Sequence, residues 1–160
     1  MTLEILNRQR TKKINARLLK QLVQALFTEL KIETAELGIH LVSAPEMTLL
    51  NETFLRHEGS TDVITFNHQD DSNPENGKIS LYGELFVCMD EAMVQAKRFR
   101  CSWQSEIVRY IVHGILHLLG HDDLKPGLRR RMKSEENRLV RRLAKKISFA
   151  QLSRTAKINA

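Results

Sequence analysis

The sequence has few of the features that mark secreted or membrane proteins. It contains only two cysteines, Cys88 and Cys101, and its start, MTLEILNRQR, has no apolar run of the kind found in secretory signals. No apolar stretch reaches membrane-spanning length, because even residues 107–119 are interrupted by Arg109 and two histidines. These absences predict a soluble protein of the reducing cytoplasm that does not bind a membrane.

Internal repeats, interdomain linkers and low-complexity segments are absent as well. A length of 160 residues suits one domain, which at this size buries a core without disulfides or a structural metal. We expect a single domain over residues 1–146 and a frayed C-terminal tail over residues 147–160. Strand and helix patterns mix without strict alternation, so the predicted fold class is α+β: a small mixed β-sheet covered by helices, with a central metal-binding helix.

Hydrophobic periodicity predicts the elements of this fold. Candidate helix caps are Asn15, Asp90 and Ser102, and Pro45 suits a first helical turn. The turn-rich segment QDDSNPENGK separates the last two predicted strands, which are therefore expected to form a hairpin with a long loop. Strands are expected at residues 3–7, 37–42, 62–66 and 81–89, and helices at residues 14–30, 46–55, 91–100 and 128–146 and in the segment after Ser102.

The segment IVHGILHLLGHDD concentrates potential metal ligands. His113 and His117 lie four residues apart, so on a helix they project from the same face and can bind one cation. Gly120 predicts the end of that helix, after which the chain can bring His121 or Asp123 back as a third ligand. Three protein ligands leave one coordination position open, which is typical of catalytic rather than structural zinc.

The predicted metal helix has an apolar face and a polar face. Glu106 falls on the polar face with the two histidines, at helical spacing. This places Glu106 where it can accept a hydrogen bond from a ligand histidine, and an ordinary exposed glutamate is the alternative. The apolar face carries Val108, Ile111, Val112, Ile115, Leu116 and Leu119.

The histidine spacing is similar to that of zinc metalloproteases, in which a glutamate directly after the first histidine acts as general base. Gly114 occupies that position here, so a peptidase of this type would lack its base. A metal can still lower the pKa of bound water or polarise a phosphoryl oxygen without that glutamate. A metal-dependent hydrolase acting on phosphodiesters is therefore the favoured reading.

The distribution of charge supports a polyanionic partner. The net charge is +6, and the basic residues gather near both ends while residues 58–91 are acidic. Basic clusters suit nucleic acid because affinity for nucleic acid comes mainly from neutralised phosphates, and a solvated helix face is the alternative. The basic residues are Arg8, Arg10, Lys12, Lys13, Arg17 and Lys20 near the start, and Arg129, Arg130, Arg131, Lys133, Arg138, Arg141, Arg142, Lys145 and Lys146 near the end.

Four stretches of the chain carry a family resemblance. They are NETFLRHEGSTDVITF from Asn51, YGELFV from Tyr82, SEIVRYIVHGILHLLGHDD from Ser105 and RMKSEENRLV from Arg131. Together they resemble the YbeY family of bacterial endoribonucleases. The resemblance implies a cytoplasmic, zinc-dependent endoribonuclease that is specific for single-stranded RNA. It implies that this enzyme acts in the processing of the 3′ end of small-subunit rRNA and in ribosome quality control. It also implies one Zn²⁺ per chain, and precursor ribosomal RNA and the ribosome or its small subunit as partners.

The family's metal ligands carry over with one change. The family has three metal histidines, of which His113 and His117 match the first two, and Asp123 stands at the third position. We favour Asp123 over His121, which occupies the family's usual tyrosine position, because Asp123 keeps the aligned backbone path and is a competent zinc ligand. The predicted ligands are therefore His113, His117 and Asp123; nickel or manganese remain alternative metals.

A second change concerns an arginine that the family places near its site. Its position falls on Leu55, and Arg56 follows directly. A shift of one helical residue turns a side chain by about 100°, so Arg56 replaces the family arginine only if the local turn is altered. Arg56 and Glu106 are the candidate catalytic residues; the alternative for Arg56 is a solvated arginine at a helix end.

Two other functions are compatible with the same residues. A non-catalytic ribosome-associated metalloprotein would use the metal only to stiffen its fold, and RNA binding would survive loss of the ligands. A metallopeptidase with an unusual general base would cut unstructured peptides, with Glu106 as the candidate base.

Overall fold

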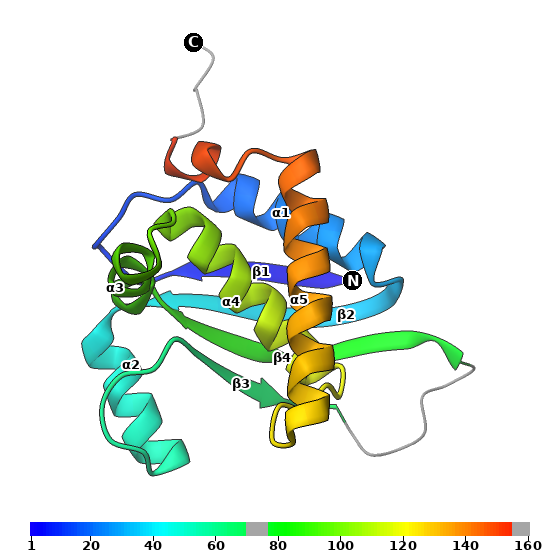
Figure 1. Cartoon of the computed structure of the whole chain (residues 1–160), viewed down its shortest axis with the longest axis horizontal. Coiled ribbons are helices and arrows are strands. Elements are labelled where there is room, and N and C mark those ends of the chain that lie inside the picture. The colour runs from blue at the N-terminus through cyan, green and yellow to red at the C-terminus, as the bar shows by residue number, and fades with distance from the viewer. Residues whose placement is uncertain (70–76, 155–160) are drawn as a thin grey trace.

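The structure is a computed structural model in which residues 1–69 and 77–154 are described. Helices and strands alternate irregularly along the chain, as expected for an α+β protein (Figure 1). The strands are β1 (Thr2–Asn7), β2 (Ile32–Val42), β3 (Val63–Asn67) and β4 (Ile79–Cys88). The helices are α1 (Ala16–Glu29), α2 (Ala44–Leu50), α3 (Met89–Phe99), α4 (Trp103–Leu118) and α5 (Pro126–Lys146).

The four strands form one mixed sheet in the order β1-β2-β4-β3. β1 and β4 each pair with β2 in parallel, whereas β3 pairs antiparallel to β4. The antiparallel pair confirms the predicted hairpin, although residues 70–76 of its predicted loop lie outside the described residues. The sheet and its helices confirm the predicted fold class.

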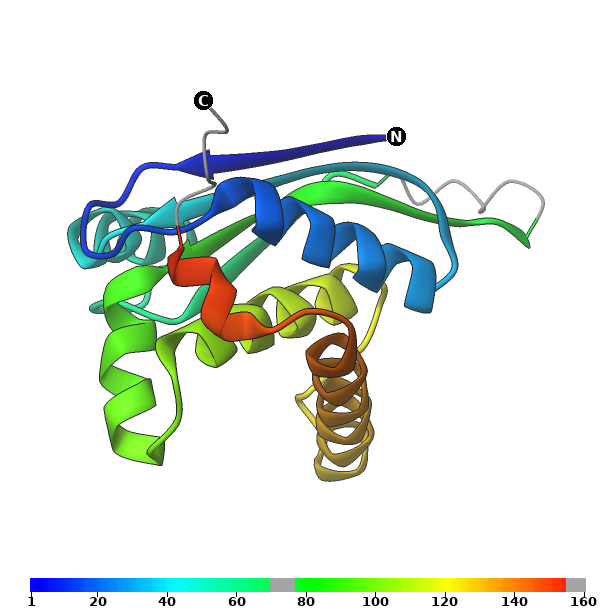
Figure 2. The same ribbon diagram turned by 90° about the horizontal axis from the view of Figure 1, so that it is seen from above.

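The two faces of the sheet are covered differently. α1 and α4 lie on the same face, which we call the helix-covered face, and α5 lies farther out against them (Figure 2). Strand side chains alternate between faces, so Leu85 enters the large core under the helices while Phe86 points to the opposite, outer face. Within residues 1–69 and 77–154, the outer face is covered at one end, where Met47 of α2 packs in a small cluster with Phe86.

Local capping explains where the helices begin. The side chains of Asn15 and Ser102 accept backbone N–H hydrogen bonds at the starts of α1 and α4, as predicted. The prediction that Asp90 caps the third helix is wrong, because α3 already begins at Met89. The Asp90 carboxylate instead accepts hydrogen bonds from the Ala44 amide and the Thr11 hydroxyl, both at 2.6 Å.

The end of the chain corrects a second prediction. Residues Phe149–Ser153 form a 3-10 turn in which Leu152 is fully buried against the main core. The Leu152 carbonyl also accepts a 2.7 Å hydrogen bond from the amide of Asn15. The expected fraying from residue 147 is therefore wrong as far as residue 154, and residues 155–160 lie outside the described part of the chain. Burial of Leu152, with Ile147 and Phe149 packed against the same core, holds this segment to the domain.

Among the described residues, no helix is both long enough and apolar enough to cross a membrane.

Candidate metal centre and adjoining hollow

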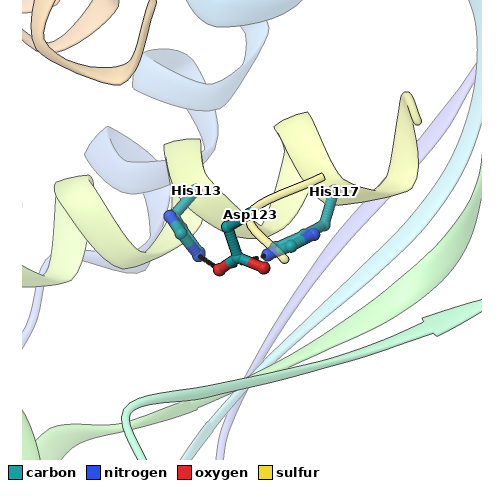
Figure 3. Close-up of side chains that lie close together, drawn as sticks. All are labelled: His113, His117 and Asp123. Carbon is teal, nitrogen blue, oxygen red and sulfur yellow. Dashed lines mark ion pairs between the residues drawn. The ribbon is translucent and has the colours of Figure 1, made fainter. Parts of the chain in front are cut away.

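Three side chains converge beside α4 in the arrangement that the sequence predicts. His113 and His117 project from one face of α4, and Asp123 returns to them from the segment after the helix (Figure 3). Asp123 Oδ2 lies 3.9 Å from His113 Nε2 and 3.5 Å from His117 Nε2. One ligand atom from each residue lies within 4.8 Å of the others, and no other such group occurs among the described residues.

The return of Asp123 depends on the end of the helix. Gly120 has φ +99°, and its amide donates to the His117 carbonyl at 3.0 Å. The His121 amide donates to the Leu116 carbonyl at the same distance, which completes a Schellman turn. Beyond the turn, the Asp122 carboxylate accepts from the Leu124 amide and Arg129 donates to the Asp123 carbonyl, so the segment that carries Asp123 is fixed at both sides.

The geometry separates the two candidate third ligands. Asp123 joins the histidine pair, whereas His121 does not belong to the group of converging ligand atoms. His121 is exposed just after the turn and lies near Glu135 of α5, whose pKa is lowered mainly by the hydrogen bond from Arg138 and slightly by His121. The structure thus places the carboxylate, not the additional imidazole, where a cation would sit.

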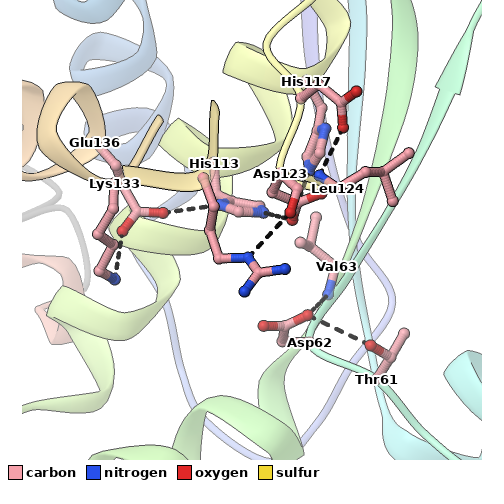
Figure 4. A network of polar contacts seen from close by, with 11 residues as sticks. Thr61, Asp62, Val63, His113, His117, Asp123, Leu124, Lys133 and Glu136 are labelled. Atoms are coloured by element: carbon pink, nitrogen blue, oxygen red, sulfur yellow. Dashed lines mark hydrogen bonds and ion pairs between the residues drawn. The ribbon is translucent and has the colours of Figure 1, made fainter. Parts of the chain in front are cut away.

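His113 is held by a carboxylate that the sequence reasoning missed. Glu136 of α5 is buried, with 3 % side-chain exposure, and its Oε1 lies 2.8 Å from His113 Nδ1 (Figure 4). Arg109 and Lys133 also donate to Glu136, at 2.7 and 2.8 Å. Burial raises the pKa of Glu136, but the hydrogen bonds from His113, Lys133 and Arg109 lower it to about 2.

This contact orients the candidate ligand. A carboxylate that accepts from Nδ1 leaves Nε2 of the same ring free to bind a metal and increases its basicity. The hydrogen bond with Glu136 also raises the pKa of His113, against the lowering effect of burial. The only sequence signal for Glu136 is its place in the stretch RMKSEENRLV, because its pairing with His113 spans 23 residues.

Glu106, the hydrogen-bond partner proposed for a ligand histidine, occupies another place. It is buried, with 8 % exposure, and its Oε1 accepts a hydrogen bond from the Cys101 thiol at 3.3 Å. Glu136, and not Glu106, makes the contact with His113 that the sequence predicted for Glu106. Glu106 nevertheless lies near the site, because it lines the same hollow as His113.

Gly114 has a structural reason to be glycine. A Cβ at this position would lie 2.8 Å from Leu85 Cδ2 and 3.4 Å from Thr65 Cγ2. The missing side chain therefore lets α4 approach β3 and β4 closely, since a core side chain cannot move freely into packed surroundings. A glutamate does not fit at Gly114, which removes the position that a metalloprotease uses for its general base.

The segment before β3 places Leu55, not Arg56, against the ligands. A π-helical turn over Asn51–Leu55 ends at Arg56, which has the left-handed φ of 55°. The local turn is thus altered, as a substitution of Arg56 for the family arginine would require. Leu55 lines a hollow with the three candidate ligands, whereas Arg56 is exposed and lines none of the described hollows. The buried Asn51 anchors this segment by donating to the Gly59 carbonyl at 2.9 Å.

Two hollows meet at the site. The smaller, of about 310 Å³, is lined by the candidate ligands, Leu55 and the first residues of β3. The larger, of about 540 Å³, lies between α3, α4 and α5. Asp62 and His113 line both hollows. Asp62 is held at the start of β3, where its Oδ1 accepts from the Val63 amide at 2.8 Å and its own carbonyl accepts from the Cys88 amide.

The three candidate ligands suit a divalent metal ion that binds both nitrogen and oxygen atoms. Two imidazole nitrogens and one carboxylate oxygen are ligands that Zn²⁺ accepts, and a fourth position would remain for water or substrate. The carboxylate–imidazole distances of 3.5 and 3.9 Å are too long for hydrogen bonds, so the three groups converge without satisfying one another. Such a separation is compatible with a cation between them.

The fold and the site are those of a candidate metal-dependent hydrolase, with three converging ligands and space for a substrate. A sequence model of the family described as Endoribonuclease YbeY matches residues 4–144. The chain belongs to this family.

Individual relatives agree with this assignment. Endoribonuclease YbeY of Chlorobium phaeovibrioides is 31 % identical over 94 % of this chain and 97 % of the relative. The Elusimicrobium minutum protein of the same name is 35 % identical over 77 % of this chain and 85 % of its own length. The Myxococcus xanthus protein is also 35 % identical, over 78 % of this chain, but the match spans only 42 % of that longer relative.

A solved structure has the same fold. The solution structure of a Thermotoga maritima protein aligns with a TM-score of 0.67 over 99 % of both chains, at 23 % sequence identity.

Proposed function

We propose that this protein is a metal-dependent endoribonuclease that cuts single-stranded RNA in ribosomal RNA maturation, at the 3′ end of the small-subunit RNA, and in ribosome quality control. The observation that carries the proposal is the convergence of His113, His117 and Asp123 in a chain of the YbeY family. We assign the metal as one Zn²⁺ per chain. Precursor ribosomal RNA and the small ribosomal subunit are the proposed partners, in the cytoplasm.

The three ligands would hold the ion beside the two hollows. A bound zinc supplies Lewis acidity to a phosphoryl oxygen and lowers the pKa of a coordinated water. Glu136 holds the His113 ring through Nδ1, so that Nε2 would already be oriented toward a bound ion. The nucleophile is a water or the substrate's own 2′-hydroxyl.

The charge near the site suits an RNA backbone. Part of the basic helix α5 is already paired, because Arg142 and Lys146 both contact Glu29 of α1. The first turns of α5, beside the candidate ligands, carry the exposed Arg129, Arg130 and Arg131. Cations in this position can neutralise phosphates on either side of the reacting one. We therefore propose that the RNA strand crosses the start of α5.

The candidate catalytic residues have different positions relative to this path. Arg56 stands at the exposed end of the π-helical turn, where its guanidinium is a proposed phosphate contact. Glu106 lines the larger hollow and is proposed to contact substrate there rather than to hold a ligand histidine. Substitution of Arg56 and of Glu106, one at a time, tests these two roles.

The central experiment compares His113→Ala with the wild-type protein. We expect His113→Ala to lose the metal, measured by elemental analysis, and to lose cleavage of a single-stranded precursor rRNA fragment. Arg141→Ala, which changes an exposed charge on α5 away from the ligands, serves as a control for nuclease contamination and general charge. Full cleavage by the metal-free variant would overturn the mechanism. RNA binding without cleavage in the wild type would support a non-catalytic ribosome-associated protein instead.

A further inference from the structure

The larger hollow adjoins the candidate metal centre, and the described residues form no second ligand cluster in it. Its volume of about 540 Å³ is within the range of small-molecule sites. Because Asp62 and His113 line both hollows, the larger one continues directly from the ligands. A strand of RNA with one phosphate at the ligands would therefore place a neighbouring nucleotide in or over this hollow.

One wall offers an aromatic surface. Phe99, the last residue of α3, lines the hollow and is 64 % exposed. The Arg98 guanidinium lies 5.7 Å from the centre of its ring. Nucleobases stack on aromatic side chains and on arginine, and such stacking contributes substantially to single-strand binding. Phe99 is therefore available as a stacking surface at the hollow.

The inner end of the hollow carries a polar group without a partner. Tyr110 is 5 % exposed, and its hydroxyl has no hydrogen-bond partner among the described residues. A buried hydroxyl without a hydrogen bond destabilises the folded protein. A ligand that supplies the missing hydrogen bond would explain why the hydroxyl is there. Burial and the Glu106 carboxylate both raise the pKa of Tyr110, which keeps the hydroxyl protonated as a donor.

Glu106 supplies an acceptor beside this donor. Its Oε1 accepts from Cys101, and its carboxylate lies close enough to Tyr110 to help raise the pKa of that residue. Donor and acceptor therefore lie side by side at the inner end of the hollow, with Phe99 on its wall. A nucleobase edge presents this pattern in reverse, with an acceptor next to a donor. All four bases present an acceptor next to a donor, but only guanine follows its O6 acceptor with two adjacent N–H donors, at N1 and N2, which one carboxylate can accept together.

We propose that the larger hollow is a nucleobase subsite for the nucleotide next to the scissile phosphate, in which Phe99 stacks on the base and Tyr110 and Glu106 read its edge, with guanine preferred. The inference rests on the proposed ribonuclease function and specifies its substrate. Lys133, 60 % exposed at the hollow, would contact the phosphate of the same nucleotide.

The test uses the metal-loaded protein and four short single-stranded RNAs that differ only at the nucleotide beside the cleavage site. Wild type should cut the guanine substrate with the highest kcat/KM. Tyr110→Phe should cut all four RNAs at similar rates. This variant removes only an unpartnered hydroxyl, so its melting temperature should not fall. A lower melting temperature with an unchanged base preference would show a structural role and overturn the proposal.

Phe99→Ala tests the stacking wall. We expect KM to rise about tenfold with kcat nearly unchanged, since stacking on one aromatic residue contributes about this much to binding. Val94→Ala is the matched control, because Val94 is also exposed on α3, at 58 %, and does not line the hollow. If Phe99→Ala and Tyr110→Phe both keep the wild-type KM and base preference while wild type cleaves RNA, the subsite is wrong and the ribonuclease function stands.

A binding measurement separates the two proposals if no RNA is cleaved. Fully 2′-O-methylated versions of the four RNAs are titrated by fluorescence anisotropy, and their intactness is checked afterwards. Tighter binding of the guanine version that Tyr110→Phe abolishes would support the subsite even though the nuclease function had failed. Equal binding of all four by wild type would overturn the subsite.

Discussion

Each face of the sheet carries a cluster of two histidines and one carboxylate, and the two clusters differ in geometry. On the helix-covered side, Asp123 Oδ2 lies 3.5 and 3.9 Å from the histidine nitrogens. On the outer face, Glu84 lies between His40 and His68, with Oε1 2.9 Å from His40 and Oε2 3.0 Å from His68. The functional groups are the same, two imidazoles and one carboxylate, but of these two clusters only the first converges on one point.

The difference lies in which groups satisfy the imidazoles. In the outer cluster each Nε2 hydrogen-bonds a separate oxygen of Glu84, so neither Nε2 is left to face a cation. In the inner cluster Glu136 takes Nδ1 of His113, and Nε2 is left facing Asp123 at more than hydrogen-bonding distance. A metal site therefore requires ligand atoms that are oriented by other partners, and residue composition alone does not identify one.

Removal of each carboxylate is the strongest test of this comparison. Asp123→Ala should lose the bound metal and reduce RNA cleavage by more than about 100-fold, since loss of a ligand exceeds the 10–100-fold effect of losing a ligand's hydrogen-bond partner. Glu84→Ala should keep one metal per chain and near-normal cleavage. Elemental analysis and kcat/KM on the same preparations give the answer, and equal metal loss in both variants would contradict the distinction.

Glycines on the two faces give a second contrast. A Cβ at Gly83 would lie 2.5 Å from the Phe66 carbonyl oxygen and 3.1 Å from Leu118 of α4. A Cβ at Gly38, on the outer face, would meet nothing closer than 3.5 Å. Gly83→Ala should therefore lower the free energy of unfolding by about 3 kcal/mol. Gly38→Ala should change it by less than about 0.5 kcal/mol. Urea unfolding measures both, and similar losses would show that the outer face is packed as tightly as the covered one.

The same contrast shows what sequence could predict. The spacing of His113, His117 and Gly120 is a local pattern, and the helix and its end follow from it, whereas the choice of Asp123 over His121 came from the family resemblance. The hairpin and the mixed sheet also follow from local periodicity and turn residues. These features depend on neighbours within a few turns of chain, which is the range over which propensities and caps act.

Features that depend on distant contacts were not predictable. Glu136 meets His113 across 23 residues, and no local pattern distinguishes it from the neighbouring Glu135. Asp90 has the residue type of a cap but holds α2 and Thr11 in place. Leu152 is one of several apolar residues scattered among polar ones near the end of the chain, and its burial depends on a core assembled by the whole chain. In each case the contacts made in the folded protein, and not the local sequence, determine the role of the residue.

The neighbouring glutamates Glu135 and Glu136 provide the third prediction. Glu136→Gln should weaken metal binding by about 10–100-fold, because the amide is a poorer acceptor for His113 Nδ1–H than the carboxylate. Glu135→Gln is the matched control, since Glu135 pairs with Arg138 at 2.6 Å on the more exposed side of α5. Competition with a chromogenic chelator measures the affinity. An equal decrease in both variants would assign the effect to the charge of α5 rather than to orientation of His113.

The smallest expected effect tests the outer cluster by its response to pH. Hydrogen bonds from His68 and His40 lower the pKa of Glu84 below its usual 4.5. A carboxyl group whose folded pKa is lowered stabilises the protein above the unfolded pKa, and that contribution disappears as pH falls through the folded value. Glu84→Gln should therefore cost up to about 1 kcal/mol near pH 7, because solvent screens this partly exposed group, and less near pH 3. Urea unfolding at pH 7, 5 and 3 measures the difference, with Glu33→Gln, whose partner Lys78 lies 4.0 Å away and exposed, as the control. A loss that stays constant down to pH 3 would mean that shape, and not the charge of Glu84, stabilises the outer face.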